Sequence, residues 1–571
     1  MRTRTYGLTL LACFCLLLFG LASVQLVGGG RYYELGLKNT IRLIPEEPYR
    51  GRILDRNQEV IVDNILSFDA VMIPQEVSDK DRVLRRLADI LSMDVDEIAA
   101  RYERGYLNPF TPVVIAEGVS KSVAIRLEEE RLEMPGVAVE LNSRRLYPFG
   151  TTAAHVIGYL GEIDRGRITR LKEYGYDIKD KVGYGGIEER LDIYMRGQKG
   201  GRQIEVDNRG RQVRLLGYKP PVPGEDVTLT IDLELQQIAD GLLNGRKGAV
   251  VVMDVRTGEI LVLSSAPAFD PNVFVDRRDR RAMNHYLTSE DAPLFNRAIR
   301  GQSPPGSVFK IVTAAAAMRE NKKFTPAASF VCHGQMKIGN RFFKCWSTHG
   351  TQDFYAAMAH SCDIYFYELG LMAGPDQLTH TAKEFGLSEP TGIDLPREAS
   401  GFIPSRIWKR LTRFEGWYDG DTANFSIGQG FVLTTPLQLA RMMAVVANGG
   451  YLPTPHVTKA VAGREVPAAA AKPVRISREH LERIRTSLRF PVSQENGTAR
   501  MLNIAGLDIC AKTGTAQVYG EESHGWVAGF FPFKNPRYAF CVFLENAGSG
   551  SYAVILARDL FREAQKRGKM S

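Results

Sequence analysis

The pattern of hydrophobic and polar positions divides the chain into three parts. Residues 8–27 form an uncharged, mostly apolar run that follows Arg2 and Arg4. Residues 78–103 carry leucine and isoleucine at helical spacing, and short strand-like runs broken by glycine and proline surround them. Residues 220–224 read PPVPG, which is typical of a boundary between domains. The pattern thus predicts an apolar helix, a mixed region and a further domain.

After residue 224 the apolar positions alternate between the strand period and the helix period. We expect strands at residues 227–231, 248–254, 259–264 and 537–545. We expect helices at residues 309–318, 354–371, 437–447 and 553–566. Strands at both ends and helices between them predict a mixed sheet with a helical subdomain, which is an α+β arrangement. We find no internal repeat.

The apolar run at residues 8–27 is long enough to cross a membrane. Its twenty residues, at about 1.5 Å each, span about 30 Å, the thickness of the hydrocarbon core. Arg2 and Arg4 favour a cytoplasmic tail at residues 1–7 and a single pass through the cytoplasmic (inner) membrane. A cleaved signal peptide is the alternative, because residues 20–22 have the small-x-small pattern of a cleavage site. Both interpretations place the bulk of the chain outside the cytoplasm, in the periplasm.

Composition narrows the class of protein. The chain has 571 residues, 44% hydrophobic and 24% charged, as in an ordinary globular protein of several domains. Seven cysteines in this length exclude a small disulfide-stapled fold. A net charge of +8 permits contact with anionic material, although an even spread of Lys and Arg is usually a solvated surface. The sequence lacks a GxxxxGK[ST] loop, HExxH and zinc-finger spacings, so we set aside nucleotide, metalloprotease and nucleic-acid functions.

The segment PPGSVFK at residues 304–310 is the first candidate for chemistry. Its prolines and glycine can turn the chain into a helix, which would put Ser307 at the helix N-terminus, where the dipole favours a developing oxyanion. Lys310 would then lie on the same helix face as the serine. Apolar neighbours would remove water from this lysine, lower its pKa and make it a base. The alternative is a capping serine followed by a surface lysine.

Two further segments lie downstream in an order and spacing that chance explains poorly. They are Ser361-Cys362-Asp363 and Lys512-Thr513-Gly514-Thr515. Gly514 removes a side chain from a predicted strand, which permits close approach of another backbone or ligand. Lys512 offers positive charge for a substrate carboxylate, and the two threonines offer hydroxyl groups. Taken alone, each segment is also consistent with an ordinary turn serine or strand lysine.

The three segments match the SxxK, SxN and KTG motifs of the penicillin-binding proteins and serine β-lactamases. Others resemble motifs of the class B penicillin-binding proteins: RGRILDRN at 50–57, RLYP at 145–148, AHVIGY at 154–159, GGIE at 185–188, RGQKG at 196–200, TID at 230–232, GAVVVMD at 248–254, SIGQG at 426–430, TTPLQ at 434–438 and WVAGF at 526–530. The resemblance implies a transmembrane anchor at residues 8–27, an elongated α+β pedestal (dimerisation-domain-like) at 28–218, and a serine β-lactamase-like transpeptidase domain at 219–571.

The resemblance also implies a function and roles for single residues. It implies a peptidoglycan D,D-transpeptidase that is inhibited covalently by β-lactams, in which Ser307 attacks the D-alanyl-D-alanine carbonyl of a stem peptide. Lys310 would be the base for this acylation, and Ser361 would relay a proton toward the leaving amine. Lys512 and Thr513 would hold the substrate carboxylate. The backbone N–H groups of Ser307 and Thr515 would form the oxyanion hole.

The middle motif departs from the family pattern at its third position. Asp363 stands where SxN has asparagine, and an aspartate accepts hydrogen bonds but donates one only when protonated. This variant resembles the elongation-type enzymes called penicillin-binding protein 2, with the division (septal) type as the alternative. A RodA-type glycan polymerase and an MreC-type scaffold are the partners implied by the resemblance.

Cys332, Cys345, His349 and Cys362 form a candidate metal site. Three thiolates and one imidazole suit tetrahedral zinc, although the gaps of twelve, three and twelve residues are not those of a zinc finger. A Cys332–Cys345 disulfide and buried thiols without any bond are the alternatives. His333 and His360 are alternative ligands. We expect the other cysteines in the lipid-facing helix, at positions 13 and 15, and in strand cores, at positions 510 and 541.

Two other functions use the same motifs. A β-lactam hydrolase or sensor is one, but the long segment at residues 31–218 argues against it, and no further carboxylate motif is placed to activate a deacylating water. A silent scaffold is the other, and the intact Ser307, Lys310 and Lys512 argue against silence. A D,D-carboxypeptidase side reaction, with water in place of the acceptor amine, remains open. No cofactor is needed for the acyl transfer itself.

Overall fold

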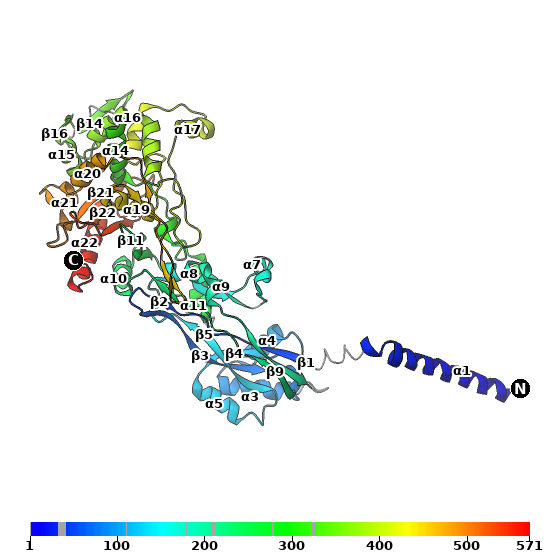
Figure 1. Cartoon of the computed structure of the whole chain (residues 1–571). Helices are drawn as coiled ribbons and strands as arrows, with labels where there is room; N and C mark the ends of the chain where they lie inside the picture. Colours follow the sequence, from blue (N-terminus) through cyan, green and yellow to red (C-terminus); the bar gives the residue numbers. More distant parts are fainter. Residues whose placement is uncertain are drawn as a thin grey trace. The chain divides into compact units, whose positions relative to one another are not determined.

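The computed structural model describes residues 2–31, 41–109, 111–178, 180–206, 212–276, 279–320 and 327–570. The chain forms two compact units, and each contains segments that are distant in sequence. The smaller unit consists of residues 1–51, 64–144 and 196–224. The larger unit consists of residues 52–63, 145–195 and 225–571. Figure 1 labels the elements of both.

The chain starts with the predicted apolar helix. Helix α1, Arg2–Ala22, continues into a π-helical turn, η1, Ser23–Val27. The span Arg4–Val27 has a mean hydropathy of 2.5, and none of it is buried in the structure. Among the described residues this is the one helix that is long and apolar enough to cross a membrane. Cys13 and Cys15 are exposed on it, as expected for residues that face lipid.

The smaller unit is an α+β module with its own hydrophobic core. Its strands are β1 (Ile41–Glu46), β8 (Gly200–Val206), β9 (Gln212–Lys219), β4 (Val113–Val119), and most of β3 (Val60–Met72) and β5 (Val137–Leu146). Its helices are α3 (Lys80–Leu91), α4 (Val95–Gly105) and α5 (Lys121–Glu129). The helix predicted at residues 78–103 is therefore two helices. Ser92 ends α3 in the left-handed region, and Asp94 caps α4 by accepting from Asp96 N–H, so the chain turns between them.

A five-stranded antiparallel sheet forms the centre of the larger unit. Its order is β12 (Ile260–Ala266), β11 (Gly248–Asp254), β23 (Tyr538–Leu544), β22 (His524–Phe531) and β21 (Cys510–Ala516). Strands from the two ends of the domain thus lie side by side, with β11 paired to β23. Strand β21 is at one edge, where one row of backbone groups has no neighbouring strand in the sheet.

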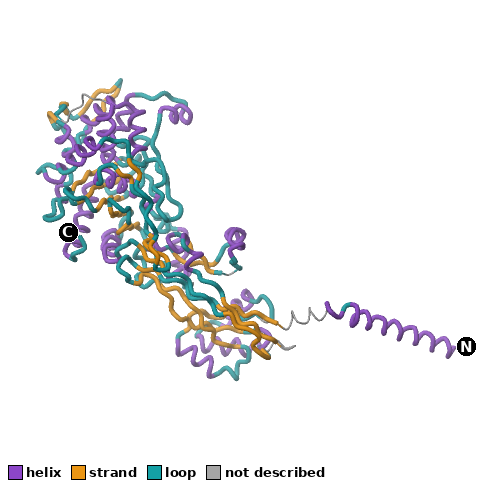
Figure 2. The backbone as a smooth tube through the Cα atoms, in the orientation of Figure 1, coloured by secondary structure: helices purple, strands orange, loops and turns teal. Residues whose placement is uncertain are grey.

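Helices cover both faces of this sheet, because its strands are apolar on both sides. On β11, Val251 belongs to the core shared with α19 (Pro436–Ala447), and Val250 and Val252 belong to the core shared with α10 (Leu233–Leu243) and α22 (Gly550–Lys566). Successive strand residues point to opposite faces, so each neighbouring pair serves two different layers. Figure 2 shows the strands enclosed by helices in this region. The predicted α+β fold is confirmed; the mixed sheet is a second one, in which β10 (Val227–Leu229) pairs parallel with β2 (Ile53–Leu54) and antiparallel with β18 (Thr458–Val461).

The helical part of the larger unit contains α14 (Lys310–Glu320), α15 (Phe354–Ala359), α16 (Asp363–Glu384) and α18 (Asp419–Ser426). The helix predicted at residues 354–371 is divided between α15 and α16, and the break falls at the middle motif. A second break lies within α16 at Gly374, whose φ is +73°, just before Pro375. The first break interrupts the helix predicted from the apolar pattern, and the second follows from the local Gly-Pro pair.

Two segments of the predicted pedestal pack with the larger unit. Arg145 and Glu188, from the second and third pedestal motifs, form an ion pair of 2.8 Å with both side chains buried. In the first motif, Asp55 Oδ2 accepts from the backbone N–H of Leu233, at the start of α10. The compact units therefore do not follow a single boundary near residue 218, and the boundary at 218/219 stays a prediction about the sequence motifs.

Candidate active site

Ser307 lies in a tight turn that the surrounding backbone holds in place. The turn is a 3₁₀ helix, Gly306–Phe309, and α14 starts at Lys310, so the serine precedes the α-helix by one turn instead of starting it. Gly306 has a φ of +54°, and a Cβ at this position would lie 2.6 Å from the carbonyl oxygen of Thr515. Ser307 is half-buried, and its Oγ has no hydrogen-bond partner among the described residues.

Lys310 is fully buried and contacts the middle motif. Its Nζ donates to the carbonyl oxygen of Ser361 at 2.7 Å, to Ser361 Oγ at 3.2 Å and to Asp363 Oδ1 at 2.8 Å. The Lys310–Asp363 contact is an ion pair with both side chains largely removed from water. In this arrangement Lys310 Nζ therefore approaches Ser361 and Asp363, and no hydrogen bond joins it to Ser307.

The break between α15 and α16 positions the middle motif. Ser361 has a φ of +55°, a left-handed conformation that is unfavourable for a residue with a side chain. Helix α16 resumes with Asp363 in its first turn, where a carboxylate interacts favourably with the helix dipole. The turn places Ser361, which is buried, against Lys310 from one side and against Lys512 from the other.

Lys512 comes from the edge strand β21 and is fully buried. Its Nζ donates to Ser361 Oγ at 2.8 Å and to the carbonyl oxygen of Thr513 at 3.1 Å. Burial, and then the positive charge of nearby Lys310, lower the pKa of Lys512 well below its ordinary value. Ser361 Oγ thus joins a lysine from the SxxK motif to a lysine from the KTG motif.

The rest of the KTG motif borders the serine turn. Thr513 Oγ1 donates to Thr498 Oγ1 at 2.9 Å, and Thr515 Oγ1 accepts from the N–H of Gly550 at 3.1 Å. A Cβ on Gly514 would lie 2.6 Å from the carbonyl oxygen of Pro305. Strand β21 therefore passes so close to the serine turn that a side chain on either facing glycine would separate them.

The loop after α18 closes another side of the turn. Gly428 accepts at its carbonyl oxygen from the N–H of Gly306 at 3.1 Å, and a Cβ on Gly428 would lie 2.4 Å from the carbonyl oxygen of Gly306. Gln429 Nε2 donates to the carbonyl oxygen of Thr515 at 3.4 Å. Sequence reasoning found the motif containing Gly428 but gave it no role, and it missed Thr498. Gly428, the first glycine of SIGQG, is the signal that could have indicated the close approach of this loop to the serine turn.

The four predicted metal ligands come together beside the middle motif. Sγ of Cys332, Cys345 and Cys362 and a ring nitrogen of His349 all lie within 4.8 Å of one another. His349 Nδ1 is 3.6 Å from Cys332 Sγ and 3.5 Å from Cys345 Sγ. His349 Nε2 is buried without a hydrogen-bond partner among the described residues. Three thiols and an imidazole that converge in this way fit the donor set of tetrahedral zinc.

The alternatives for this cluster are also tested by the geometry. All seven cysteines are among the described residues and all are free, so no disulfide joins Cys332 to Cys345. His360 Nδ1 lies 2.8 Å from Gln352 Oε1, outside the cluster, and His333 is not part of it either. The pair of thiols from Cys345 and Cys362 shares a hydrogen bond, which lowers the pKa of Cys345 to about 4 and raises that of Cys362. These opposite shifts of the two pKa values result from the close approach of the two sulfur atoms.

Two family models match the chain. Residues 248–563 match the penicillin-binding protein transpeptidase domain, and residues 45–229 match the penicillin-binding protein dimerisation domain. The transpeptidase match contains all three motifs, which meet in the site described above. The chain therefore belongs to the class B penicillin-binding proteins.

Several similar proteins are named as peptidoglycan D,D-transpeptidases or as penicillin-binding protein 2. The peptidoglycan D,D-transpeptidase MrdA of Escherichia coli (strain K12) is 33% identical, with 95% of this chain and 90% of the relative covered. The relative of the same name from Acinetobacter baumannii is also 33% identical, over 98% of this chain and 87% of the relative. Penicillin-binding protein 2 of Helicobacter pylori, solved in complex with MreC, is 27% identical and has a TM-score of 0.84, with 93% of this chain and 100% of that chain covered. A chain of a peptidoglycan synthase complex is 30% identical, with a TM-score of 0.74 and 100% and 99% coverage.

Proposed function

We propose that the chain is a peptidoglycan D,D-transpeptidase of the elongation type, which cross-links stem peptides through a serine acyl-enzyme. Three motifs distant in sequence contribute to one buried cluster of hydroxyl, amine and carboxylate groups. The observation that carries the proposal is the position of Ser361 Oγ, within hydrogen-bond distance of both Lys310 Nζ and Lys512 Nζ. The names of the MrdA relatives support the substrate, and the likeness to a solved penicillin-binding protein 2 supports the elongation role.

In the proposed acylation, Ser307 Oγ attacks the carbonyl carbon of the penultimate D-alanine of a stem peptide. In the proposed reacting state Lys310 Nζ is a neutral amine and takes the proton of the Ser307 hydroxyl, which gives the ammonium group that pairs with Asp363 Oδ1 in the structure. The tetrahedral oxyanion is stabilised by the backbone N–H groups of Ser307 and Thr515, which lie on the facing turn and strand. The peptide bond then breaks and the terminal D-alanine leaves as an amine.

Ser361 carries the proton that the leaving amine needs. Its Oγ accepts from both lysines, so a proton taken by Lys310 can reach the hydroxyl and the leaving nitrogen along one short path. The amine of a neighbouring stem then attacks the acyl-enzyme, gives up its proton along the same path and releases Ser307. Water in place of that amine gives the D,D-carboxypeptidase reaction.

Lys512 and Thr513 bind the terminal carboxylate of the substrate in this proposal, with Gly514 and Thr515 completing the strand. A substrate that lies along the edge of β21 adds to the sheet as a further strand, and its backbone is then held by the strand's unpaired groups. Asp363 positions Lys310 through their ion pair, a role that a carboxylate fills with more charge than the asparagine of the usual motif.

We further propose that Cys332, Cys345, His349 and Cys362 hold a zinc ion. Bound there, the ion would cross-link the segment at residues 330–352 to the turn that carries Ser361 and Asp363. It supplies no step of the acyl transfer. Asp363 N–H donates to Cys345 Sγ at 3.3 Å, so the cluster already contacts the catalytic turn. The ion's role is to keep that turn in its left-handed conformation.

The remaining proposals concern location and partners. The helix Arg4–Val27 fits a single-pass anchor in the cytoplasmic membrane, and the positive residues before it favour a periplasmic location for the rest. The domain division is a tail at 1–7, an anchor at 8–27, a pedestal at 28–218 and a transpeptidase domain at 219–571. The solved complex of penicillin-binding protein 2 with MreC, and the peptidoglycan synthase complex, support an MreC-type scaffold and a RodA-type glycan polymerase as partners.

Intact-protein mass spectrometry with benzylpenicillin tests the acyl-enzyme. Wild type is expected to gain one penicilloyl group that is released slowly, and Ser307→Ala is expected to gain none. Rapid loss of the adduct would favour a β-lactam hydrolase, and no adduct on wild type would overturn the proposal. Cell elongation in a strain depleted of the protein tests the cellular role, because a septation defect with normal elongation would favour the division type.

A further inference from the structure

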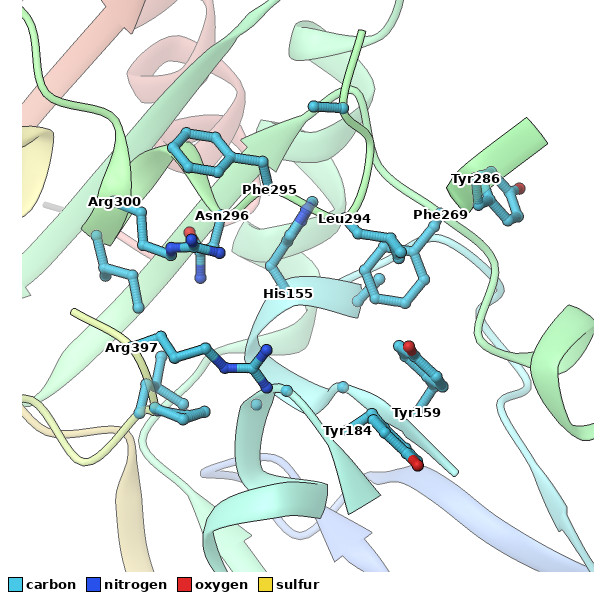
Figure 3. A pocket seen from close by; sticks show the side chains of 18 of the residues that line it. His155, Tyr159, Tyr184, Phe269, Tyr286, Leu294, Phe295, Asn296, Arg300 and Arg397 are labelled. Carbon is cyan, nitrogen blue, oxygen red and sulfur yellow. The ribbon is translucent and has the colours of Figure 1, made fainter. Parts of the chain in front are cut away.

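A second cavity, of about 340 Å³, lies within the larger unit, and none of the SxxK, middle-motif or KTG residues lines it. Figure 3 shows its wall, which combines aromatic rings with two guanidinium groups. Its lining includes Tyr159, Tyr184, Phe269, Tyr286, Arg300 and Arg397. A volume in this range accepts one sugar ring or a fragment of a few peptide units.

The fixed charges in the lining of this cavity are all positive. Its lining contains two arginines and no aspartate or glutamate. Arg300 stacks on the Phe295 ring at 4.8 Å, and its guanidinium has no ion pair or side-chain hydrogen bond among the described residues. Burial, and then the nearby charge of Arg397, lower the pKa of Arg300 below its ordinary value. The burial of Arg300 and its repulsion by Arg397 would both be offset by an anion between the two guanidinium groups, so binding of an anion there is favoured.

The backbone of Arg397 has an unfavourable conformation where it borders the cavity. Its φ is +64°, a left-handed conformation for a residue with a long side chain. Its guanidinium forms an ion pair with Glu189, which does not line the cavity. In Figure 3 the ends of the Arg300 and Arg397 side chains both point toward the middle of the cavity. This loop conformation thus places the guanidinium of Arg397 at the same cavity as that of Arg300, although two exposed arginines would ordinarily lie apart because they repel each other.

The opposite wall is rigid and aromatic. Tyr159 stacks on Phe274 with ring centroids 3.9 Å apart and on Tyr184 at 5.4 Å, and Phe269 packs edge-on against Tyr159 at 5.8 Å. Asn296 Oδ1 accepts from Ala298 N–H, and within the described part of the chain its amide nitrogen has no acceptor. Because Tyr159 is stacked by Phe274 and Tyr184, and Arg167 covers the Tyr184 ring, this wall offers mainly apolar ring edges, which suit an alkyl part of a peptide or a sugar next to the charged end of a ligand.

We propose that this cavity is a second binding site for uncross-linked peptidoglycan, in which Arg300 and Arg397 hold a carboxylate of a muropeptide and the aromatic wall holds the adjoining sugar or peptide. The inference rests on the proposed function for the identity of the ligand, because the cell-wall polymer is the carboxylate-rich material that such an enzyme meets. Binding here is separate from catalysis, and it would keep a donor or acceptor strand near the enzyme between reactions.

The experiment separates this site from the catalytic cleft by blocking the cleft. The full-length protein in detergent is acylated to completion with benzylpenicillin, and intact mass verifies one adduct. Isothermal titration calorimetry then measures binding of a soluble disaccharide pentapeptide, with the free pentapeptide, the disaccharide without peptide, and inorganic phosphate as separate arms. We expect one site per acylated chain for the disaccharide pentapeptide, weaker binding of the pentapeptide or the disaccharide, and none of phosphate.

Variants assign that binding to the cavity. Arg300→Gln and Arg397→Gln are each expected to raise the dissociation constant at least about tenfold, the usual effect of losing one charge-assisted contact. Arg464→Gln, which removes an exposed arginine outside the cavity, is the matched control and is expected to bind as wild type. All three should be acylated by penicillin at the wild-type rate, because none belongs to the proposed machinery.

The outcomes that overturn the inference are distinct from those that overturn the function. Loss of all muropeptide binding on acylation, or wild-type binding by Arg300→Gln and Arg397→Gln, would remove the second site and leave the transpeptidase intact. Phosphate binding at the strength of the disaccharide pentapeptide would also overturn it, since any anion would then suffice. Absence of a penicillin adduct would count against the proposed function, and the arginine variants compared on unacylated protein would still decide the cavity.

Discussion

Lys512 Nζ donates to Ser361 Oγ at 2.8 Å across 151 residues of sequence, and both groups are buried. The contact joins the edge of the sheet to the turn between α15 and α16. Lys310 Nζ also donates to Ser361 Oγ, at 3.2 Å, so the side chains of two lysines share one hydroxyl group. Burial and then the neighbouring charge of Lys310 lower the pKa of Lys512 well below its ordinary value, so it gives up a proton more readily than an exposed lysine.

Lys512→Arg tests whether Lys512 also takes part in proton transfer through Ser361, besides binding the substrate carboxylate. Arginine keeps a positive charge for a substrate carboxylate but stays protonated, so it cannot take part in proton relay through Ser361. We expect the rate of acylation by benzylpenicillin to fall by about 100-fold or more, as for loss of an acid–base group. Stopped-flow measurement with a fluorescent penicillin checks this. A rate within a few-fold of wild type would mean that Lys512 contributes only charge.

The same lowered pKa predicts a pH dependence. Since the folded-state pKa of Lys512 lies below the ordinary lysine value, the acylation rate of wild type should rise with pH through that pKa and then level off. The unfolded chain binds a proton at this lysine more readily than the folded chain does, so the contribution of Lys512 to stability also rises with pH over the same window. An acylation rate that falls with rising pH in that range would contradict the assignment.

Asp363→Asn tests the departure from the usual motif. The substitution removes the negative charge that faces the buried ammonium group of Lys310 at 2.8 Å. We expect a loss of about 1–3 kcal/mol in the free energy of unfolding, since an amide oxygen can still accept one hydrogen bond. We also expect acylation to slow by about tenfold or more, because Lys310 loses the group that orients it. Denaturant unfolding and the penicillin-labelling rate measure the two effects.

A matched control for this variant exists elsewhere in the larger unit. Lys409 is also buried, and its Nζ lies 2.7 Å from Asp421 Oδ2. Asp421→Asn should therefore lower stability by a similar amount while leaving the rate of acylation unchanged. Equal slowing of acylation in both variants would show that Asp363 acts only through global stability.

The cysteine cluster gives a prediction about metal content. Cys345→Ser is expected to lower bound zinc and the thermal unfolding temperature together, because a hydroxyl is a poor ligand for zinc in place of a thiolate. Cys541→Ser is the control, since Cys541 is buried in β23 and outside the cluster, so it should lower stability without changing zinc content. Elemental analysis of the purified wild-type protein that finds no zinc would remove the metal from the proposal.

Many strands and helices could be predicted from the local hydrophobic pattern, but the breaks between helices could not. Strand β11 and helix α19 lie within one residue of the predicted bounds, because both are buried on all sides and read as continuous apolar runs. The turn at Ser361 interrupts a similar apolar run, and nothing local stops the helix there. Contacts to Lys310 and Lys512, which come from elsewhere in the chain, accompany the break. Such tertiary contacts are invisible to periodicity.

The candidate site was predictable as a set of residues but not as a set of contacts. The motifs identified the groups, and the spacing of the serine and lysine suggested that Lys310 faces Ser307. In the structure Lys310 Nζ donates to Ser361 and Asp363, contacts that the spacing of a single motif could not predict. The linear boundary near residue 218 likewise gave no sign that residues 52–63 and 145–195 pack with the larger unit.

Asp240 predicts a second pH effect, on stability alone. Its carboxylate accepts from Ala153 N–H at 3.0 Å, from Gln236 and from the Ser264 hydroxyl, and burial raises its pKa to about 6. Because the folded pKa exceeds the ordinary value of 3.8, the folded chain binds a proton more tightly, and stability falls as pH rises from about 4 to 6. Asp240→Asn should flatten this slope, a change on the order of 3 kcal/mol. Urea unfolding across that pH range, with an unchanged slope in the variant, would contradict the assignment.

Gly306→Ala tests the close approach of the serine turn to strand β21. A Cβ at Gly306 would lie 2.6 Å from the carbonyl oxygen of Thr515, and the φ of +54° is itself unfavourable for alanine by about 1 kcal/mol. Gly339→Ala separates the two effects, because Gly339 has a φ of +60° but open space around a Cβ. We expect both variants to lose some stability and only Gly306→Ala to lose acylation by 100-fold or more, since strand and turn must move apart by more than the oxyanion hole tolerates. Equal acylation rates in the two variants would mean that the facing glycines serve the fold and not the reaction.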